Sequence, residues 1–103
     1  MLPQSQLDEL LVSEAEEKVE KPPLFQVLLH NDDYTTMEFV VFVLESIFNM
    51  PEDQAVQVML NVHVKGIGVA GVYTFEIAEM KTAKTTALAR EHEFPLLVTM
   101  ERA

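Results

Sequence analysis

The chain has 103 residues, of which 49% are hydrophobic and 23% charged, a composition that builds one domain with a buried core. It contains no cysteine, which excludes disulfides, thiolate metal sites and cysteine nucleophiles. Seven Lys and Arg against 17 Asp and Glu give a formal net charge of −10, so the field of the protein repels nucleic acid and anionic membrane surfaces.

Residues 1–23 differ in composition from the rest of the chain. Up to residue 21 this segment carries six acidic residues and two lysines but no aromatic residue. It ends at Pro22-Pro23, a pair that stops helices and stiffens the backbone. We therefore expect a flexible acidic N-terminal arm over residues 1–23 and one domain over residues 24–103.

The first half of this domain reads as a strand followed by two helices. Alternating apolar residues predict a strand over Leu24–His30. Thr35 and Glu38 have the spacing of a capping box, which predicts that a helix begins near Thr36. Pro51, followed by two acidic residues, is typical of the first turn of a second helix.

The second half continues with a strand, a helix and a final strand. The glycines of Gly66-Ile67-Gly68 end the second helix and precede a strand over Val69–Tyr73. Thr74 is expected to cap a third helix that runs to about Arg90, and Phe94-Pro95 separates this helix from a strand over Leu96–Met100. The order β-α-α-β-α-β predicts an α+β fold in which a small three-stranded sheet packs against three helices.

The polar segment Asn31-Asp32-Asp33 lies between a predicted strand end and a helix start. Ordinary turn chemistry explains such a segment, and so does a binding loop. With His63 and a hollow lined by methionine, it could bind a cationic group tethered to an apolar one. A metal site of Asp32, Asp33 and His63 is a further alternative, although the two acids lack EF-hand spacing. No motif of nucleophilic catalysis or phosphate binding occurs.

Four blocks of the sequence carry a family resemblance. They are Asn31–Val40, Met59–His63, Gly71–Thr74 with Glu76, and His92–Leu97. In this order they resemble ClpS, the adaptor of the bacterial Clp protease for the N-end rule, and the similarity covers about residues 22–103 as well as the acidic arm. The chain departs from the family pattern at Thr36, where proline is usual, and at Met80, where a smaller residue is usual.

The resemblance implies a non-enzymatic adaptor, with no cofactor or metal, that binds N-degrons. These are proteins whose first residue is Leu, Phe, Tyr or Trp, and the adaptor hands them to the ClpAP protease. Asn31, Asp32 and His63 would hold the α-amino group. The side-chain pocket would be lined by Leu29, Thr35, Met37, Val40, Met59, Val62 and Leu96. Glu76 and Lys81 match positions that face the N-terminal domain of ClpA, and the arm would help commit the substrate to the unfoldase.

The proposed amine site is chemically reasonable, because an ammonium has three donors and an amide oxygen, a carboxylate and a neutral imidazole supply acceptors. Two other functional classes stay open at this point. One is a structural interaction module of the ribosomal-stalk C-terminal-domain type, which predicts no small apolar pocket, and the other is a small metal-dependent enzyme. We further expect a cytoplasmic monomer, because no apolar run is long enough to span a bilayer and the N-terminus lacks a secretory signal.

Overall fold

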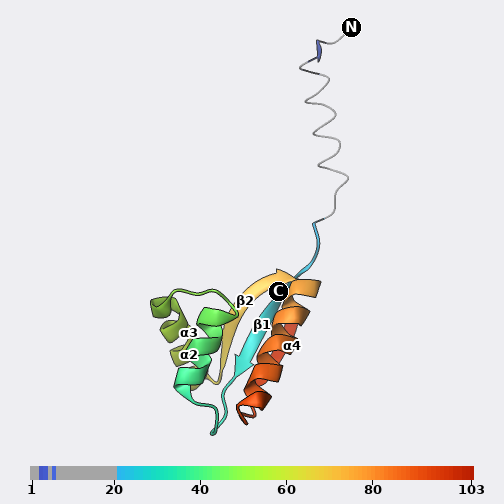
Figure 1. Ribbon diagram of the computed structural model, residues 1–103. Coiled ribbons are helices and arrows are strands. Elements are labelled where there is room, and N and C mark those ends of the chain that lie inside the picture. Colours follow the sequence, from blue (N-terminus) through green and yellow to red (C-terminus); the bar gives the residue numbers. More distant parts are fainter. Residues whose placement is uncertain (1–2, 5, 7–20) are drawn as a thin grey trace.

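The computed structural model describes residues 3, 4, 6 and 21–103, and Figure 1 shows how they are arranged. The elements are β1 (Leu24–His30), α2 (Met37–Ser46), α3 (Glu52–Lys65), β2 (Ile67–Thr74), α4 (Phe75–Glu91) and β3 (Leu97–Arg102). From residue 21 on, the strands form one antiparallel sheet in the order β2-β1-β3. The predicted α+β fold and element order are confirmed. The expected arm lies largely outside the described residues.

The helices pack on one face of the sheet. Val27 and Leu29 of β1 and Val98 of β3 are buried in one cluster with Val43 and Leu44 of α2. Successive strand residues point to opposite faces, so the intervening residues turn away from the helices. In Figure 1, α2 and α3 lie together on one side of β1 and α4 on the other. None of the helices in the described part of the chain is long and apolar enough to cross a membrane.

Two glycines determine how α3 meets β2. Gly66 ends α3 with φ 86°, in the left-handed region that favours glycine, and its N–H donates to the carbonyl of Val62. At Gly68 a Cβ atom would lie 2.6 Å from Cγ2 of Val62, so a larger residue would push the strand away from the helix. The glycines thus hold α3 close to the sheet at Val62.

The predicted capping box at Thr35 is wrong by one residue. Thr36 is the N-cap of α2, and its hydroxyl accepts a hydrogen bond from the backbone N–H of Phe39 at 3.2 Å. The hydroxyl of Thr35 donates instead to the carboxylate of Asp32. Thr36 has φ −74°, a value that proline also adopts, so the departure from the family pattern leaves the backbone unchanged at this position and adds a side-chain cap.

Three other element boundaries differ from the prediction. Pro51 is the N-cap of α3 rather than a residue of its first turn. β2 spans Ile67–Thr74, longer than expected, because its ladder with β1 runs from Thr74 to Ile67. β3 begins at Leu97 and extends to Arg102, because its residues pair with β1 from His30 opposite Leu97 to Phe25 opposite Arg102.

Replacing Thr36 by valine removes the cap hydroxyl and keeps the side-chain shape. We expect Thr36→Val to lower the free energy of unfolding by about 0.5–2 kcal/mol, the usual cost of losing an N-cap. Urea unfolding measures this change. Thr36→Pro serves as a comparison, because it also removes the hydroxyl but fixes the backbone near the observed φ. Unchanged stability of Thr36→Val would contradict the capping role.

Candidate functional site

A tight loop joins β1 to α2 and is closed by the side chain of Asp32. Its Oδ1 atom accepts hydrogen bonds from the backbone N–H groups of Tyr34 at 2.8 Å and Thr35 at 2.7 Å. Its Oδ2 atom accepts one from the hydroxyl of Thr35 at 2.7 Å. The N–H of Asn31 donates to the carbonyl of Gly66 at 2.9 Å, which fastens the start of the loop to the end of α3.

These contacts favour the ionised form of Asp32. Partial burial raises the pKa of its carboxyl group, but the hydrogen bonds from Thr35 and Tyr34 and the positive charge of Arg90 outweigh that effect. The pKa therefore lies below the ordinary value of 3.8. At neutral pH the loop carries a fixed negative charge.

Two helices place apolar side chains opposite this loop. Met37 and Val40 lie three residues apart on α2, and Met59, Val62 and His63 lie within a run of five residues on α3, so each set shares one helix face. Val40 and Val62 are almost fully buried, whereas Met37 is 44% exposed. The helices therefore supply a buried base and an exposed rim.

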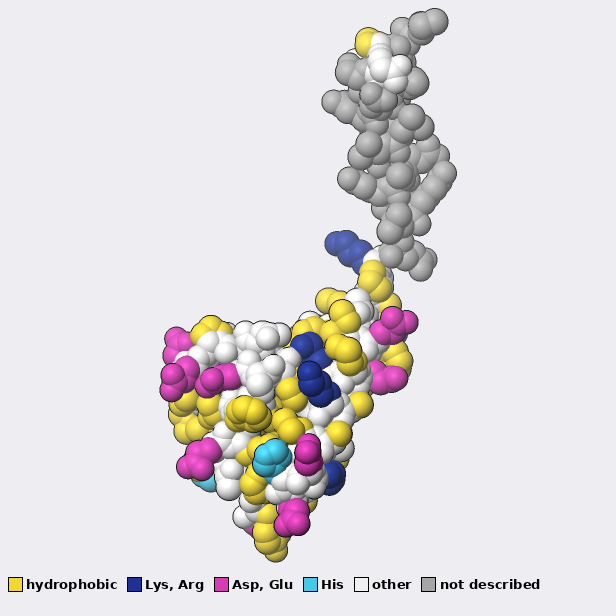
Figure 2. All heavy atoms as spheres, viewed as in Figure 1, with side chains coloured by type: hydrophobic (Ala, Val, Ile, Leu, Met, Phe, Trp, Pro, Cys, Tyr) yellow, Lys and Arg dark blue, Asp and Glu magenta, His cyan; other side chains and the backbone are white. Residues whose placement is uncertain are grey.

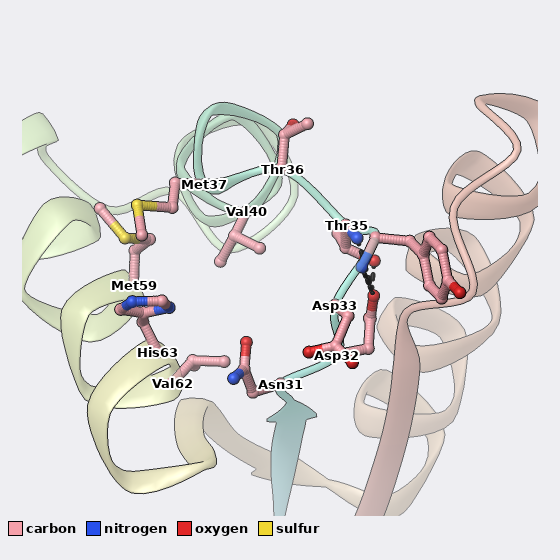
Figure 3. Close-up of a pocket in the computed structure, with 11 residues that line it drawn as sticks. Asn31, Asp32, Asp33, Thr35, Thr36, Met37, Val40, Met59, Val62 and His63 are labelled. Atoms are coloured by element: carbon pink, nitrogen blue, oxygen red, sulfur yellow. Dashed lines mark hydrogen bonds between the residues drawn. The ribbon is translucent and has the colours of Figure 1, made fainter.

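The loop and the two helices enclose a pocket of about 380 Å³. Its lining residues are Asn31, Asp32, Asp33, Tyr34, Thr35, Thr36, Met37, Val40, Met59, Val62 and His63. In Figure 3 the side chains of Asn31, Val40, Val62 and His63 surround a common space, with the two methionines on the side away from Asp32 and Thr35. One side thus carries oxygen acceptors, and the other carries the thioethers together with the imidazole of His63.

The structure brings together most of the residues that the sequence analysis selected for binding. Eight of them line this pocket: Asn31, Asp32, Thr35, Met37, Val40, Met59, Val62 and His63. Leu29 and Leu96 do not line it; they are fully buried in the cluster that also contains Val40 and Val62. Asp33, which the sequence analysis named in the polar segment and in the alternative metal site, also lines the pocket. Tyr34 and Thr36 line it although they were not selected as site residues, and their position in the same short loop was the available signal.

Glu76 and Lys81 lie on α4, outside the pocket. Glu76 is exposed in the first turn of α4. The Nζ atom of Lys81 donates to the carbonyl of Ile47 at 2.6 Å and lies 5.6 Å and 5.2 Å from the ring centroids of Phe48 and Tyr73. Lys81 therefore connects α4 to the C-terminal end of α2.

The chemistry of the pocket lining is that of hydrogen-bond acceptors beside apolar groups. Although Asp32, Asp33 and His63 all line it, residues 3, 4, 6 and 21–103 contain no group of three His, Asp or Glu side chains that could hold a metal. Acceptors beside an apolar hollow suit a positively charged donor attached to a hydrophobic side chain.

Comparisons with known proteins agree on one family. The family model "ATP-dependent Clp protease adaptor protein ClpS" matches residues 20–99. The chain belongs to the ClpS family. The Clp protease adapter protein ClpS of Hyphomonas neptunium is 55% identical over 92 residues, which cover 89% of this chain and 78% of that protein. ClpS of Myxococcus xanthus is 54% identical over 89 residues, which cover 86% of this chain and 83% of that protein.

A solved structure shows the same fold. The structure of Agrobacterium tumefaciens ClpS2 bound to L-phenylalaninamide matches with a TM-score of 0.78 and 43% sequence identity, covering 81% of this chain and all of the other. The resemblance seen in the sequence is confirmed, and this ClpS chain is a non-catalytic adaptor of the Clp protease. Membership of this adaptor family sets aside both the metal-dependent enzyme and the stalk-type module. The stalk-type module had in addition predicted that no small apolar pocket would be present, whereas the structure contains one.

The low pKa of Asp32 gives stability a defined pH dependence. Because the unfolded chain binds this proton more readily, the stabilisation is present above the unfolded value near 3.8 and is lost as pH falls through the lower folded value. We expect Asp32→Asn to reduce the free energy of unfolding at pH 6, and the deficit to shrink below pH 4. Urea titrations across this range measure it. Asp33→Asn, which removes a neighbouring charge and leaves the three hydrogen bonds in place, is the control.

Proposed function

We propose that this chain binds proteins whose first residue is Leu, Phe, Tyr or Trp and delivers them to the ClpAP protease. The observation that carries the proposal is the pocket itself, in which oxygen acceptors face a hollow lined by valine and methionine. L-phenylalaninamide, present in the Agrobacterium tumefaciens structure, combines a free α-amino group with an aromatic side chain. The same combination fits the two walls of this pocket.

Asn31, Asp32 and His63 are assigned to the α-amino group. A carboxylate offers about four lone-pair positions, and three of them on Asp32 are taken by the loop. Asp32 therefore contributes its charge and one remaining position on Oδ2. The amide oxygen of Asn31 and a neutral nitrogen of His63 supply the other two acceptors that an ammonium requires.

The aliphatic wall is assigned to the first side chain. A volume of about 380 Å³ is at the low end for ligand sites and suits one amino-acid residue. Met37 and Met59 can repack around either a branched or an aromatic side chain. Leu29 and Leu96, buried behind Val40 and Val62, are assigned the supporting role of keeping the base of the pocket closed.

Delivery is assigned to α4 and the arm. On the face that Figure 2 shows, Lys and Arg side chains gather over α4, with acidic side chains beside them. Glu76 and Lys81 belong to this helix, and we assign them to docking on the N-terminal domain of ClpA. Residues 1–23 are assigned to engagement of the substrate by the unfoldase.

A peptide that begins with leucine tests the amine site. Acetylation of its N-terminus removes the charge and two donors, so we expect affinity to fall about 100-fold or more, as the cost of leaving two acceptors unpaired predicts. Asn31→Ala and His63→Ala should each weaken the free peptide about tenfold. Gln57→Ala, an exposed change on α3 away from the pocket, is the control. Equal binding of the free and acetylated peptides would overturn the proposal.

Two variants separate recognition from delivery. A chain starting at Lys21 should bind the leucine peptide and the ClpA N-terminal domain unchanged, while ClpAP degrades a leucine-initiated protein far more slowly. Glu76→Lys should also keep peptide affinity but lose docking on that domain. Glu45→Lys, exposed on α2, is the matched control. Loss of peptide binding in the shortened chain, or full-speed degradation with it, would contradict the role of the arm.

A further inference from the structure

A second hollow of about 510 Å³ adjoins the pocket. It is lined by Tyr34, Arg90, Glu93, Phe94 and Pro95. Tyr34 lines both hollows, and its side chain is 77% exposed. The positive charge of Arg90 also reaches across to Asp32, whose pKa it helps to lower. The two sites therefore share one wall.

The far wall of this hollow is a rigid turn. The N–H of Glu93 donates to the carbonyl of Arg90 and that of Phe94 to the carbonyl of Ala89, the hydrogen bonds of a Schellman motif at the end of α4. Glu93 occupies the left-handed position, with φ 63°, where glycine is usual. The ring of Phe94 packs against Phe39 of α2 with 4.9 Å between centroids. A non-glycine residue adopts this conformation only where its surroundings fix the backbone, and at Glu93 the hydrogen bonds of the turn do so.

Arg90 presents a flat cationic surface at this turn. Its Nη1 atom donates to the carbonyls of Phe94 at 2.8 Å and Leu96 at 3.0 Å, which holds the guanidinium plane in place. A fixed guanidinium stacks on aromatic rings and attracts their electron-rich faces. Tyr34 and Pro95 add apolar surface beside it.

We propose that the second hollow binds an aromatic side chain at the second or third residue of the same substrate, an inference that rests on the proposed function. Arg90 and Glu93 carry opposite charges, so neither an acidic nor a basic side chain gains net attraction, whereas a neutral ring uses the apolar lining and the guanidinium face together. An extended chain advances about 3.3–3.6 Å per residue. Because Tyr34 lines both hollows, a substrate whose first residue occupies the pocket can place the side chain of its second or third residue in the second hollow.

Peptides of two series test this with the unaltered protein: Leu-X-Ala-Ala-Lys and Leu-Ala-X-Ala-Lys, each carrying a dye on the terminal lysine. X is Ala, Phe, cyclohexylalanine, Glu or Lys, and fluorescence anisotropy gives Kd. We expect Phe at one of the two positions to bind about fivefold tighter than Ala, and tighter than cyclohexylalanine, whose saturated ring has a similar size and no π face. Glu and Lys should give no such gain.

The inference is overturned if Phe equals Ala at both positions, if cyclohexylalanine equals Phe, or if Glu or Lys binds tighter than Phe. Failure of the proposed function looks different: the Ala peptides would then bind no better than their acetylated forms.

Protein variants test whether the tighter binding of the Phe peptide arises in the second hollow. In Arg90→Gln the ratio of Kd between the Ala and Phe peptides should approach one, whereas Lys84→Gln, an equal loss of charge at an exposed position of the same helix, should keep the ratio. Pro95→Ala is a second variant, because Arg90 also holds the 94–96 backbone, and it should lower the ratio without removing those hydrogen bonds. An undiminished ratio in both Arg90→Gln and Pro95→Ala would place the aromatic side chain elsewhere.

Discussion

Three hydrogen bonds to one carboxylate determine the shape of this binding site. Because Asp32 accepts from Tyr34 and twice from Thr35, the chain reverses within a few residues after β1. Thr36 then stands extended at the start of α2, and the first turns of that helix bring Met37 and Val40 to the pocket. The same hydrogen bonds lower the pKa of Asp32, so the contacts that fold the loop also maintain its charge.

Local patterns predicted the element order well and the boundaries less well. The two adjacent threonines show why. Spacing alone assigned the cap to Thr35, since Glu38 lies three residues later. In the folded chain Asp32 competes for the Thr35 hydroxyl and leaves Thr36 to cap the helix. A contact of this kind depends on how the loop folds, which helix periodicity does not encode.

The residues that line the pocket were predictable from the sequence where few residue types can do the required chemistry, and less predictable where many can. An amide, a carboxylate and a histidine in separate elements form a distinctive set, and Asn31, Asp32 and His63 do line one pocket. Leu29 and Leu96 illustrate the opposite case, because an apolar residue serves a core and a hollow equally well. Lys81 is similar: α2 has no basic residue in its last turn, and Lys81 reaches from α4 to the carbonyl of Ile47. A cation at that end of a helix stabilises it, so Lys81 has a structural role whether or not it meets a partner.

In the proposed function, the acceptors and the apolar surface of the pocket have different tasks, and together they would let a small site select the end of a chain. Burying a Leu or Phe side chain contributes roughly 1.5–3 kcal/mol, but an internal residue would gain the same amount. An internal residue has one amide donor instead of three ammonium donors, so it would leave buried acceptors unpaired at about 1–3 kcal/mol each. In the proposed function, discrimination between a chain end and its interior therefore belongs to Asn31 and Asp32 of the β1–α2 loop together with His63 of α3, and discrimination among side chains belongs to the apolar residues of α2 and α3. Both kinds of discrimination require a fixed distance between the loop and α3. The hydrogen bond from the N–H of Asn31 to the carbonyl of Gly66 holds the loop to the end of α3.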